Sequence, residues 1–85
     1  MNIMDIVLEI KPVIINSTED QQANTDWETI MRDEFNKKNT EKLRNMAKKL
    51  SLKPHIYEVH LLAQGDDDPE LQEFYRKGKL KFKMF

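Results

Sequence analysis

Apolar side chains recur at intervals of three and four residues through the middle of this chain, which is the spacing of an amphipathic helix. One such stripe comprises Trp27, Ile30, Met31 and Phe35. A second stripe comprises Leu43, Met46, Ala47 and Leu50. Because only a few polar residues separate the two, the pattern predicts a central antiparallel helical hairpin, with helices over about 26–37 and 40–51.

A further helix is predicted over residues 68–77. Asp68 is a suitable N-cap, Pro69 is favoured at the first helical position, and Gly78 is a typical helix stop. The apolar face of this segment would comprise Leu71, Phe74 and Tyr75.

The N-terminal segment 3–15 fits two structures. Its apolar residues have helical spacing, and Pro12 predicts that a helix would end near Lys11. The run "IVLEI" alternates as a strand does, so a strand is the alternative. The polar residues 16–26 show no periodicity and predict a loop, in which Thr25 or Asp26 would cap the following helix.

Two apolar segments alternate with a period of two and form a short β component of the predicted fold. Residues 55–62 combine β-branched and aromatic side chains, although a buried helix also fits them. Residues 79–85 alternate lysine with apolar residues, as an edge strand does, and we expect this tail either to pair with the 55–62 segment or to remain available to a partner. The prediction is therefore a mainly α single domain spanning 1–85, with an α+β fold as the alternative.

Composition narrows the class of protein. Eighty-five residues support one modest core, and the absence of cysteine excludes a disulfide scaffold, a thiolate metal site and a cysteine nucleophile. Acidic residues interrupt the apolar start of the chain, which therefore cannot cross a bilayer and does not read as a signal peptide. We expect a cytoplasmic protein. Abundant Lys, Asn and Ile, with few Gly, Ala and Arg, indicate an AT-rich genome, bacterial or viral.

Charge is distributed unevenly along the chain. Residues 1–35 have a net charge of −6 and residues 36–85 a net charge of +5. The bases gather in residues 36–54 and again in residues 76–83. Such asymmetry favours an anionic partner. The alternative is an ordinary solvated surface whose bases pair with the protein's own acidic half.

Residues 41–65 resemble a helix-turn-helix over about twenty positions. Ala47 fits the small residue of the first helix, and Ser51 to Pro54 fit the turn. The second half is nevertheless very apolar and offers no arginine to read bases, and Glu58 would face phosphates. DNA binding is therefore the alternative function. The candidate residues for binding a partner or nucleic acid are Lys42, Arg44, Lys48, Lys49, Lys53 and His55.

The sequence contains no motif that is typical of a catalytic or metal site. His55 and His60 are five residues apart, which suits neither a metal pair on a helix nor one on a strand face. The acids at 66–70 lack the glycine and the bidentate acid of a calcium loop. With only two glycines, no phosphate-cradling loop can form. We expect no enzyme activity, no metal and no cofactor.

These exclusions predict a small regulatory protein that binds and modulates another protein. Nucleic acid is the alternative partner, and a membrane surface is the least favoured because the basic apolar tail is too short for strong binding. The tail is a candidate docking element, either for a partner or for a second copy of this chain. Its apolar side chains are Leu80, Phe82 and Met84.

Overall fold

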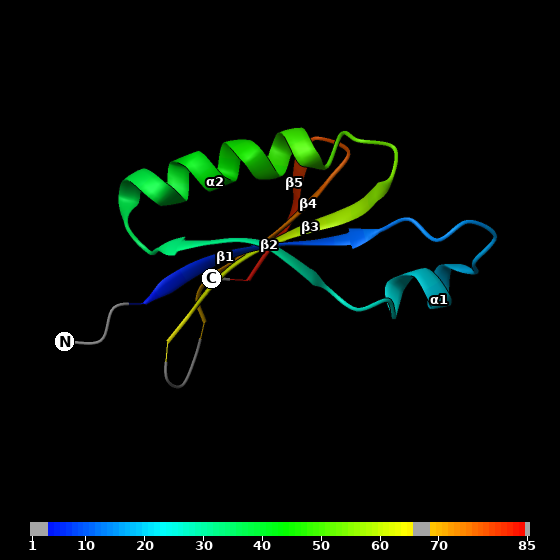
Figure 1. Ribbon diagram of the computed structural model, residues 1–85, viewed down its shortest axis with the longest axis horizontal. Coiled ribbons are helices and arrows are strands. Elements are labelled where there is room, and N and C mark those ends of the chain that lie inside the picture. The colour runs from blue at the N-terminus through cyan, green and yellow to red at the C-terminus, as the bar shows by residue number, and fades with distance from the viewer. Residues whose placement is uncertain (1–3, 66–68, 85) are drawn as a thin grey trace.

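A five-stranded antiparallel sheet with one long helix on one of its faces forms this protein (Figure 1). The computed structural model describes residues 4–65 and 69–84. The strand order is β2-β1-β3-β4-β5. In chain order the elements are β1 Asp5–Pro12, α1 Glu19–Ala23, β2 Glu28–Glu34, α2 Lys37–Leu50, β3 Ile56–Gln64, β4 Pro69–Arg76 and β5 Lys79–Lys83.

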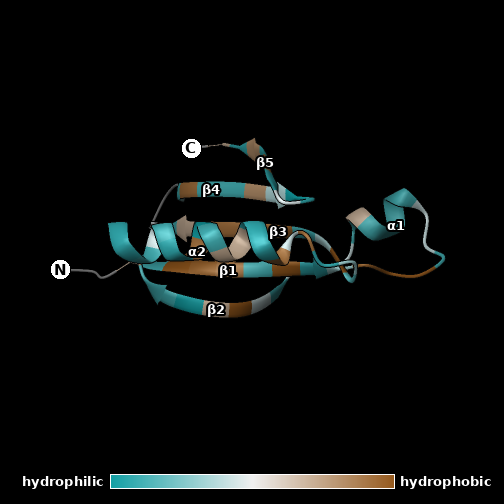
Figure 2. Ribbon diagram, turned by 90° about the horizontal axis from the view of Figure 1, so that it is seen from above, coloured by the Kyte–Doolittle hydropathy of each residue, from teal (hydrophilic) through white to brown (hydrophobic). Residues whose placement is uncertain are grey.

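The core lies between α2 and the two central strands. In β1 the fully buried Ile6 and Leu8 alternate with more exposed residues, as a strand with one buried face requires. Figure 2 shows the hydrophobic parts of β1 and β3 beneath a helix whose outer side is largely hydrophilic. The buried apolar residues are Ile6, Leu8, Leu43, Ala47, Ile56, Val59, Leu61, Ala63, Leu71 and Tyr75.

The prediction of a mainly α fold was wrong. Of the predicted helical hairpin only the second helix is present, as α2, which begins with Asn36 as its N-cap. Residues 26–37 contain strand β2, and residues 68–77 contain strand β4. The 3–15 segment contains β1, so its strand alternative is confirmed and its helix was wrong, and 55–62 and 79–85 also contain strands. The α+β alternative comes nearer, although it expected strands in only two of these five segments.

Local irregularities explain why 26–37 and 68–77 were mistaken for helices. The register between β1 and β2 shifts at a bulge, so Leu8 pairs with Met31 and Glu9 with Thr29, which leaves Ile30 as the extra residue. An extra residue turns a spacing of two into a spacing of three, which imitates a helix. In β4 the charged Glu73 occupies a core position, so the alternation of apolar residues was hidden.

Two smaller expectations also change. The polar segment 16–26 was predicted to be a loop, but it contains the short helix α1. Thr18 and Gln21 form a capping box at the N-terminus of this helix. The tail does not pair with the 55–62 segment, because β5 pairs with β4 at the edge of the sheet.

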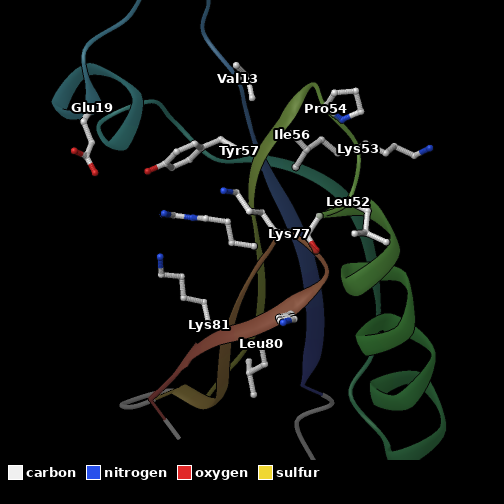
Figure 3. Close-up of a pocket in the computed structure, with 13 residues that line it drawn as sticks. Val13, Glu19, Leu52, Lys53, Pro54, Ile56, Tyr57, Lys77, Leu80 and Lys81 are labelled. Atoms are coloured by element: carbon white, nitrogen blue, oxygen red, sulfur yellow. The ribbon is translucent and has the colours of Figure 1, made fainter.

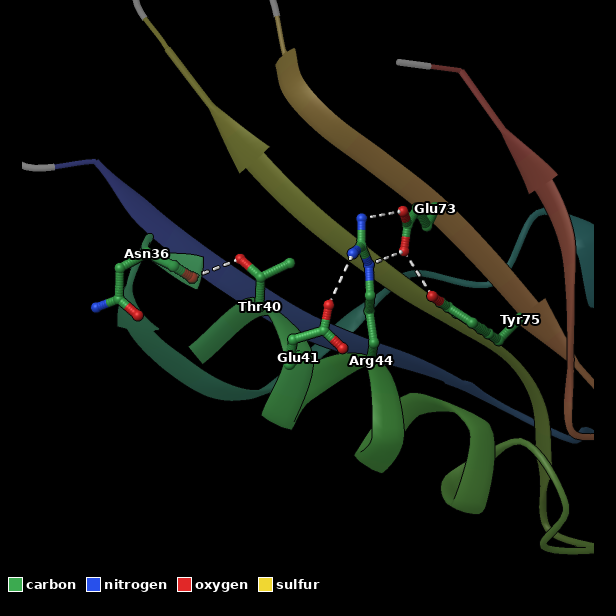
Figure 4. A network of polar contacts seen from close by, with 6 residues as sticks. All are labelled: Asn36, Thr40, Glu41, Arg44, Glu73 and Tyr75. Carbon is green, nitrogen blue, oxygen red and sulfur yellow. Dashed lines mark hydrogen bonds and ion pairs between the residues drawn. The ribbon is translucent and has the colours of Figure 1, made fainter. Parts of the chain in front are cut away.

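A buried ion pair fastens α2 to β4 (Figure 4). The Glu73 side chain is 2% exposed and faces the helix, where Arg44 donates to its two oxygens at 3.0 and 2.8 Å. The Tyr75 hydroxyl donates to the same carboxylate. Burial by itself would raise the pKa of Glu73, but the hydrogen bonds from Arg44 and Tyr75 outweigh it and lower the pKa. Glu73 is therefore a charged core residue with its partners supplied.

Replacing Arg44 with Ala should lower the free energy of unfolding by about 3 kcal/mol, because it leaves the buried Glu73 carboxylate without its cation. The matched control is Lys42→Ala, which removes an ion pair with Asp33 whose lysine side chain is 51% exposed. That control should cost less than about 1 kcal/mol. Denaturant unfolding measures both values, and equal losses in the two variants would contradict this role for Arg44.

Candidate functional site

A large concave feature lies where the β4–β5 turn meets the connection from α2 to β3 (Figure 3). It is a pocket of about 870 Å³, a size typical of ligand and peptide sites. We call it the basic pocket. Its lining residues are Val13, Glu19, Ser51, Leu52, Lys53, Pro54, Ile56, Tyr57, Arg76, Lys77, Lys79, Leu80 and Lys81.

The β4–β5 turn is fixed in place by the end of α2. Lys77 and Gly78 both have positive φ, at 55° and 81°, as a tight two-residue hairpin turn requires. The Gly78 N–H donates to Ser51 Oγ at 2.8 Å, and that hydroxyl donates to the Lys48 carbonyl at 2.9 Å. The Leu52 side chain packs directly against Gly78. One rim of the pocket is therefore held against the other.

The pocket gathers positive charge from two distant parts of the chain. Lys53 comes from the α2–β3 connection, while Lys77, Lys79 and Lys81 come from the β4–β5 hairpin. None of these four side chains has an ion-pair partner among the described residues. The only acid in the lining is Glu19. The result is a concentrated and unneutralised positive surface, which favours an anionic ligand.

Arg76 differs from the four lysines because its guanidinium is already paired with a carboxylate. Its guanidinium donates to Glu58 at 2.8 Å and lies 4.4 Å from the centre of the Tyr57 ring. A guanidinium held between a carboxylate and an aromatic face stiffens the wall of the pocket. Arg76 therefore contributes to the shape of the pocket, and the lysines supply its free charge.

Apolar side chains are exposed in the same pocket. Leu52 is 67% exposed, Leu80 45% and Val13 41%. Large apolar side chains that remain accessible within one concave site are typical of binding surfaces. The basic pocket thus offers both charge and apolar contact.

The predicted binding residues are scattered over the structure. Arg44 is in the buried pair with Glu73, and Lys42 pairs with Asp33 at 2.9 Å. Lys48 and Lys49 are exposed on the last turn of α2. His55 is exposed in the α2–β3 connection but does not line the pocket. Of the six candidates, Lys53 alone belongs to the pocket lining.

The predicted docking tail is also divided. Leu80 lines the basic pocket, whereas Phe82 packs on Phe74, with 5.8 Å between ring centres. Met84 is 52% exposed, and its N–H donates to the Gln72 carbonyl. The helix-turn-helix reading fails structurally, because its second helix is strand β3. The two basic clusters were visible in the sequence, but their meeting at one pocket depends on the contact of the β4–β5 turn with Ser51 and Leu52 at the end of α2.

The sheet face opposite α2 carries an aromatic cluster of its own, formed by Trp27, His60, Phe74 and Phe82. The His60 and Phe74 rings are stacked, with 4.4 Å between centres and 8° between planes. The Lys11 ammonium lies over Trp27 at 4.5 Å. The rings of Trp27, His60 and Phe74 pack on one another and on Lys11, so they act as a small second core. Phe82, at the edge of the cluster, is 55% exposed, and a single exposed ring is not a platform for stacking successive bases.

His60 sits at the centre of that cluster with both ring nitrogens hydrogen-bonded. Its Nδ1 is 3.0 Å from Glu9 Oε1, and its Nε2 is 3.1 Å from the Gln72 amide nitrogen. An amide nitrogen only donates, so Nε2 accepts and the proton is on Nδ1. Burial lowers the pKa of His60, and the bond to Glu9 only partly opposes this. His60 is therefore a neutral structural residue.

Comparison of this chain with protein-family models, with curated proteins and with solved structures finds no match. Within residues 4–65 and 69–84, no helix is both long and apolar enough to cross a membrane. In the same residues, no three His, Asp or Glu side chains are grouped so that they could hold a metal ion. The function must therefore be argued from the two surfaces described above.

The neutral state of His60 predicts a pH-dependent stability. A folded-state pKa below the ordinary value of 6.5 means that the unfolded chain binds the proton more readily. Stability is then complete above pH 6.5 and falls as the pH drops below it. Denaturant unfolding between pH 7 and pH 5 measures this slope. It should largely disappear in His60→Phe and persist in the control His55→Gln, and a slope that persists in both would contradict the assignment.

Gly78→Ala tests how the hairpin is fastened. An alanine methyl would lie 2.7 Å from Leu52 Cδ2, at a backbone φ of 81° that alanine rarely adopts. We expect a loss of about 1–3 kcal/mol in unfolding free energy. In Gly78→Ala/Leu52→Ala the clash is absent while the backbone strain remains, so part of the loss should be recovered. A double variant as unstable as the sum of the single variants would show that Leu52 does not pack on this turn.

Proposed function

We propose that this protein is a small non-enzymatic regulator that acts by binding another protein through the basic pocket. The observation that carries this proposal is the grouping of Lys53, Lys77, Lys79 and Lys81 around exposed apolar side chains. Keeping four like charges close together costs stability through repulsion, and a partner of opposite charge repays that cost. The pocket is therefore built for a ligand that brings negative charge.

The apolar side chains favour a protein over a nucleic acid as that ligand. Leu52, Leu80 and Val13 each leave apolar surface exposed in the pocket, and protein interfaces combine apolar contact with polar and charged groups. Nucleic-acid readers use arginine at base edges and free aromatic faces for stacking. Here the pocket arginine is bound to Glu58, and the aromatic cluster lies on the sheet face opposite α2.

Binding alone is sufficient for regulation by a protein of this size. The positive pocket would speed encounter with a negatively charged partner and orient it before close contact forms. Once bound, the domain covers part of the partner's surface and blocks whatever else uses that surface. No chemical step is required of any residue described above.

Charge reversal in the pocket tests the proposal. The Lys79→Glu/Lys81→Glu variant should lose specific protein partners in affinity capture from the native host by about tenfold or more, because attraction becomes repulsion. The matched control is Lys48→Glu/Lys49→Glu, which reverses two exposed charges on α2 outside the pocket lining. Quantitative mass spectrometry of the captured proteins, after nuclease treatment, compares the two.

The control variant should keep those partners. Equal losses in both variants would mean that general positive charge, and not the pocket, holds the partner. If no captured protein depends on Lys79 and Lys81 after nuclease treatment, while a parallel capture without nuclease recovers nucleic acid, the proposal is overturned in favour of the nucleic-acid alternative. Circular dichroism and thermal unfolding establish that both variants are folded.

A further inference from the structure

We propose that the basic pocket binds an acidic protein segment in which carboxylates flank one large apolar side chain. This inference rests on the proposed function, and it specifies the chemistry of the partner. The three features that carry it are an apolar seat, lysines on both sides of that seat, and a sheet edge that resists strand addition.

The apolar seat is formed by Leu52 and Leu80. Leu52 follows α2 and leans on the β4–β5 turn at Gly78, while Leu80 belongs to β5 just beyond that turn. Both line the pocket, and Leu52 is 67% and Leu80 45% exposed, so each has apolar surface that the fold leaves uncovered. A leucine-sized or phenylalanine-sized side chain of the ligand that contacts this seat would remove part of that surface from water.

The lysines lie on both sides of the hairpin. Figure 3 shows Lys53 and Leu52 on the side of α2, and Lys81 and Tyr57 on the opposite side, toward Glu19. A ligand seated on the leucines therefore meets positive charge in both directions. This arrangement fits a segment with acids before and after its apolar residue better than it fits a single anion.

The kind of base in the pocket favours carboxylates over phosphodiesters. Lysine is a point charge on a flexible stem, and it can follow carboxylates that have no fixed geometry. Arginine gives the planar fork that holds phosphate with two parallel hydrogen bonds. Among the residues lining the pocket the only arginine is Arg76, and its guanidinium is bound to Glu58 and Tyr57.

The edge of β5 directs recognition to side chains. The register with β4 shifts between Phe74 and Tyr75. Phe82 pairs with Phe74 and Leu80 pairs with Tyr75, which leaves Lys81 as the extra residue of a bulge. Bulges and lysines on an edge strand discourage the addition of another strand. The partner segment is therefore held in the pocket by its side chains and does not extend the sheet.

Fluorescence anisotropy with short labelled peptides tests this inference on the full chain. The probe has a central leucine between runs of glutamate. One control peptide replaces the leucine with serine at the same charge, and another keeps the leucine and replaces the glutamates with glutamine. We expect the probe to bind with at least tenfold higher affinity than either control, and its affinity to fall as salt is raised.

Protein variants locate the binding. Leu52→Ser and Lys79→Glu/Lys81→Glu should each weaken the probe about tenfold or more, and Lys48→Glu/Lys49→Glu should weaken it much less. Equal binding of the leucine and serine peptides would overturn the inference, as would tighter binding of a single-stranded oligonucleotide of the same charge. If no peptide binds but cellular partners still depend on Lys79 and Lys81, this inference fails while the proposed function stands.

Discussion

A sheet has two faces, and this chain supplies one long helix to cover them. That constraint shapes the rest of the molecule. α2 takes the face formed by Ile6, Leu8 and Leu61, where the fully buried residues lie. In the part of the chain that the structure describes, the opposite face has no long helix over it, and its apolar surface is covered from water by side chains of the sheet and of its flanking loops. Trp27, His60 and Phe74 pack together there, and the burial of His60 in that cluster lowers its pKa.

The position of α2 also creates the basic pocket. The helix is joined to β4 by the ion pair between Arg44 and Glu73, and its last turn reaches the β4–β5 hairpin through Ser51. The hairpin turn and the α2–β3 connection are thereby held next to each other, each with its own lysines. The repulsion among these lysines is tolerated because the buried ion pair and the Ser51 contact hold the two parts together. The scaffold thus presents a charged surface, and the acidic partner that we propose would neutralise it.

The strand order separates charge across the molecule. The acidic first part of the chain forms β1 and the edge strand β2, and the basic last part forms the other edge, β5. Among the described residues, Glu19 is the one acid of that first part in the pocket lining, and none of the four pocket lysines has an ion-pair partner, whereas the alternative interpretation of the sequence requires such pairing. Outside the pocket, Lys42 does pair with an acid of the first part of the chain, Asp33. The same separation gives the molecule a direction in which it can approach a charged partner.

The sequence by itself determined the features that local pattern controls. The stripe of Leu43, Met46, Ala47 and Leu50 predicted α2, and alternation indicated strands for 55–62 and 79–85. The lack of cysteine excluded thiol chemistry, and the uneven charge was plain from the residues alone. These features need no knowledge of which segments meet, because each depends on neighbours in the chain or on composition.

Only the tertiary structure decided the features that depend on distant partners. β2 is a strand because it pairs with β1, although its bulge at Ile30 imitates a helix. Glu73 can occupy the core because Arg44, 29 residues away, neutralises it, and so Arg44 is unavailable to a partner. Lys53 joins Lys77, Lys79 and Lys81 because Ser51 holds the hairpin turn at the end of α2. Periodicity reports the environment of a segment and not the identity of its neighbours, so it cannot foresee such pairings.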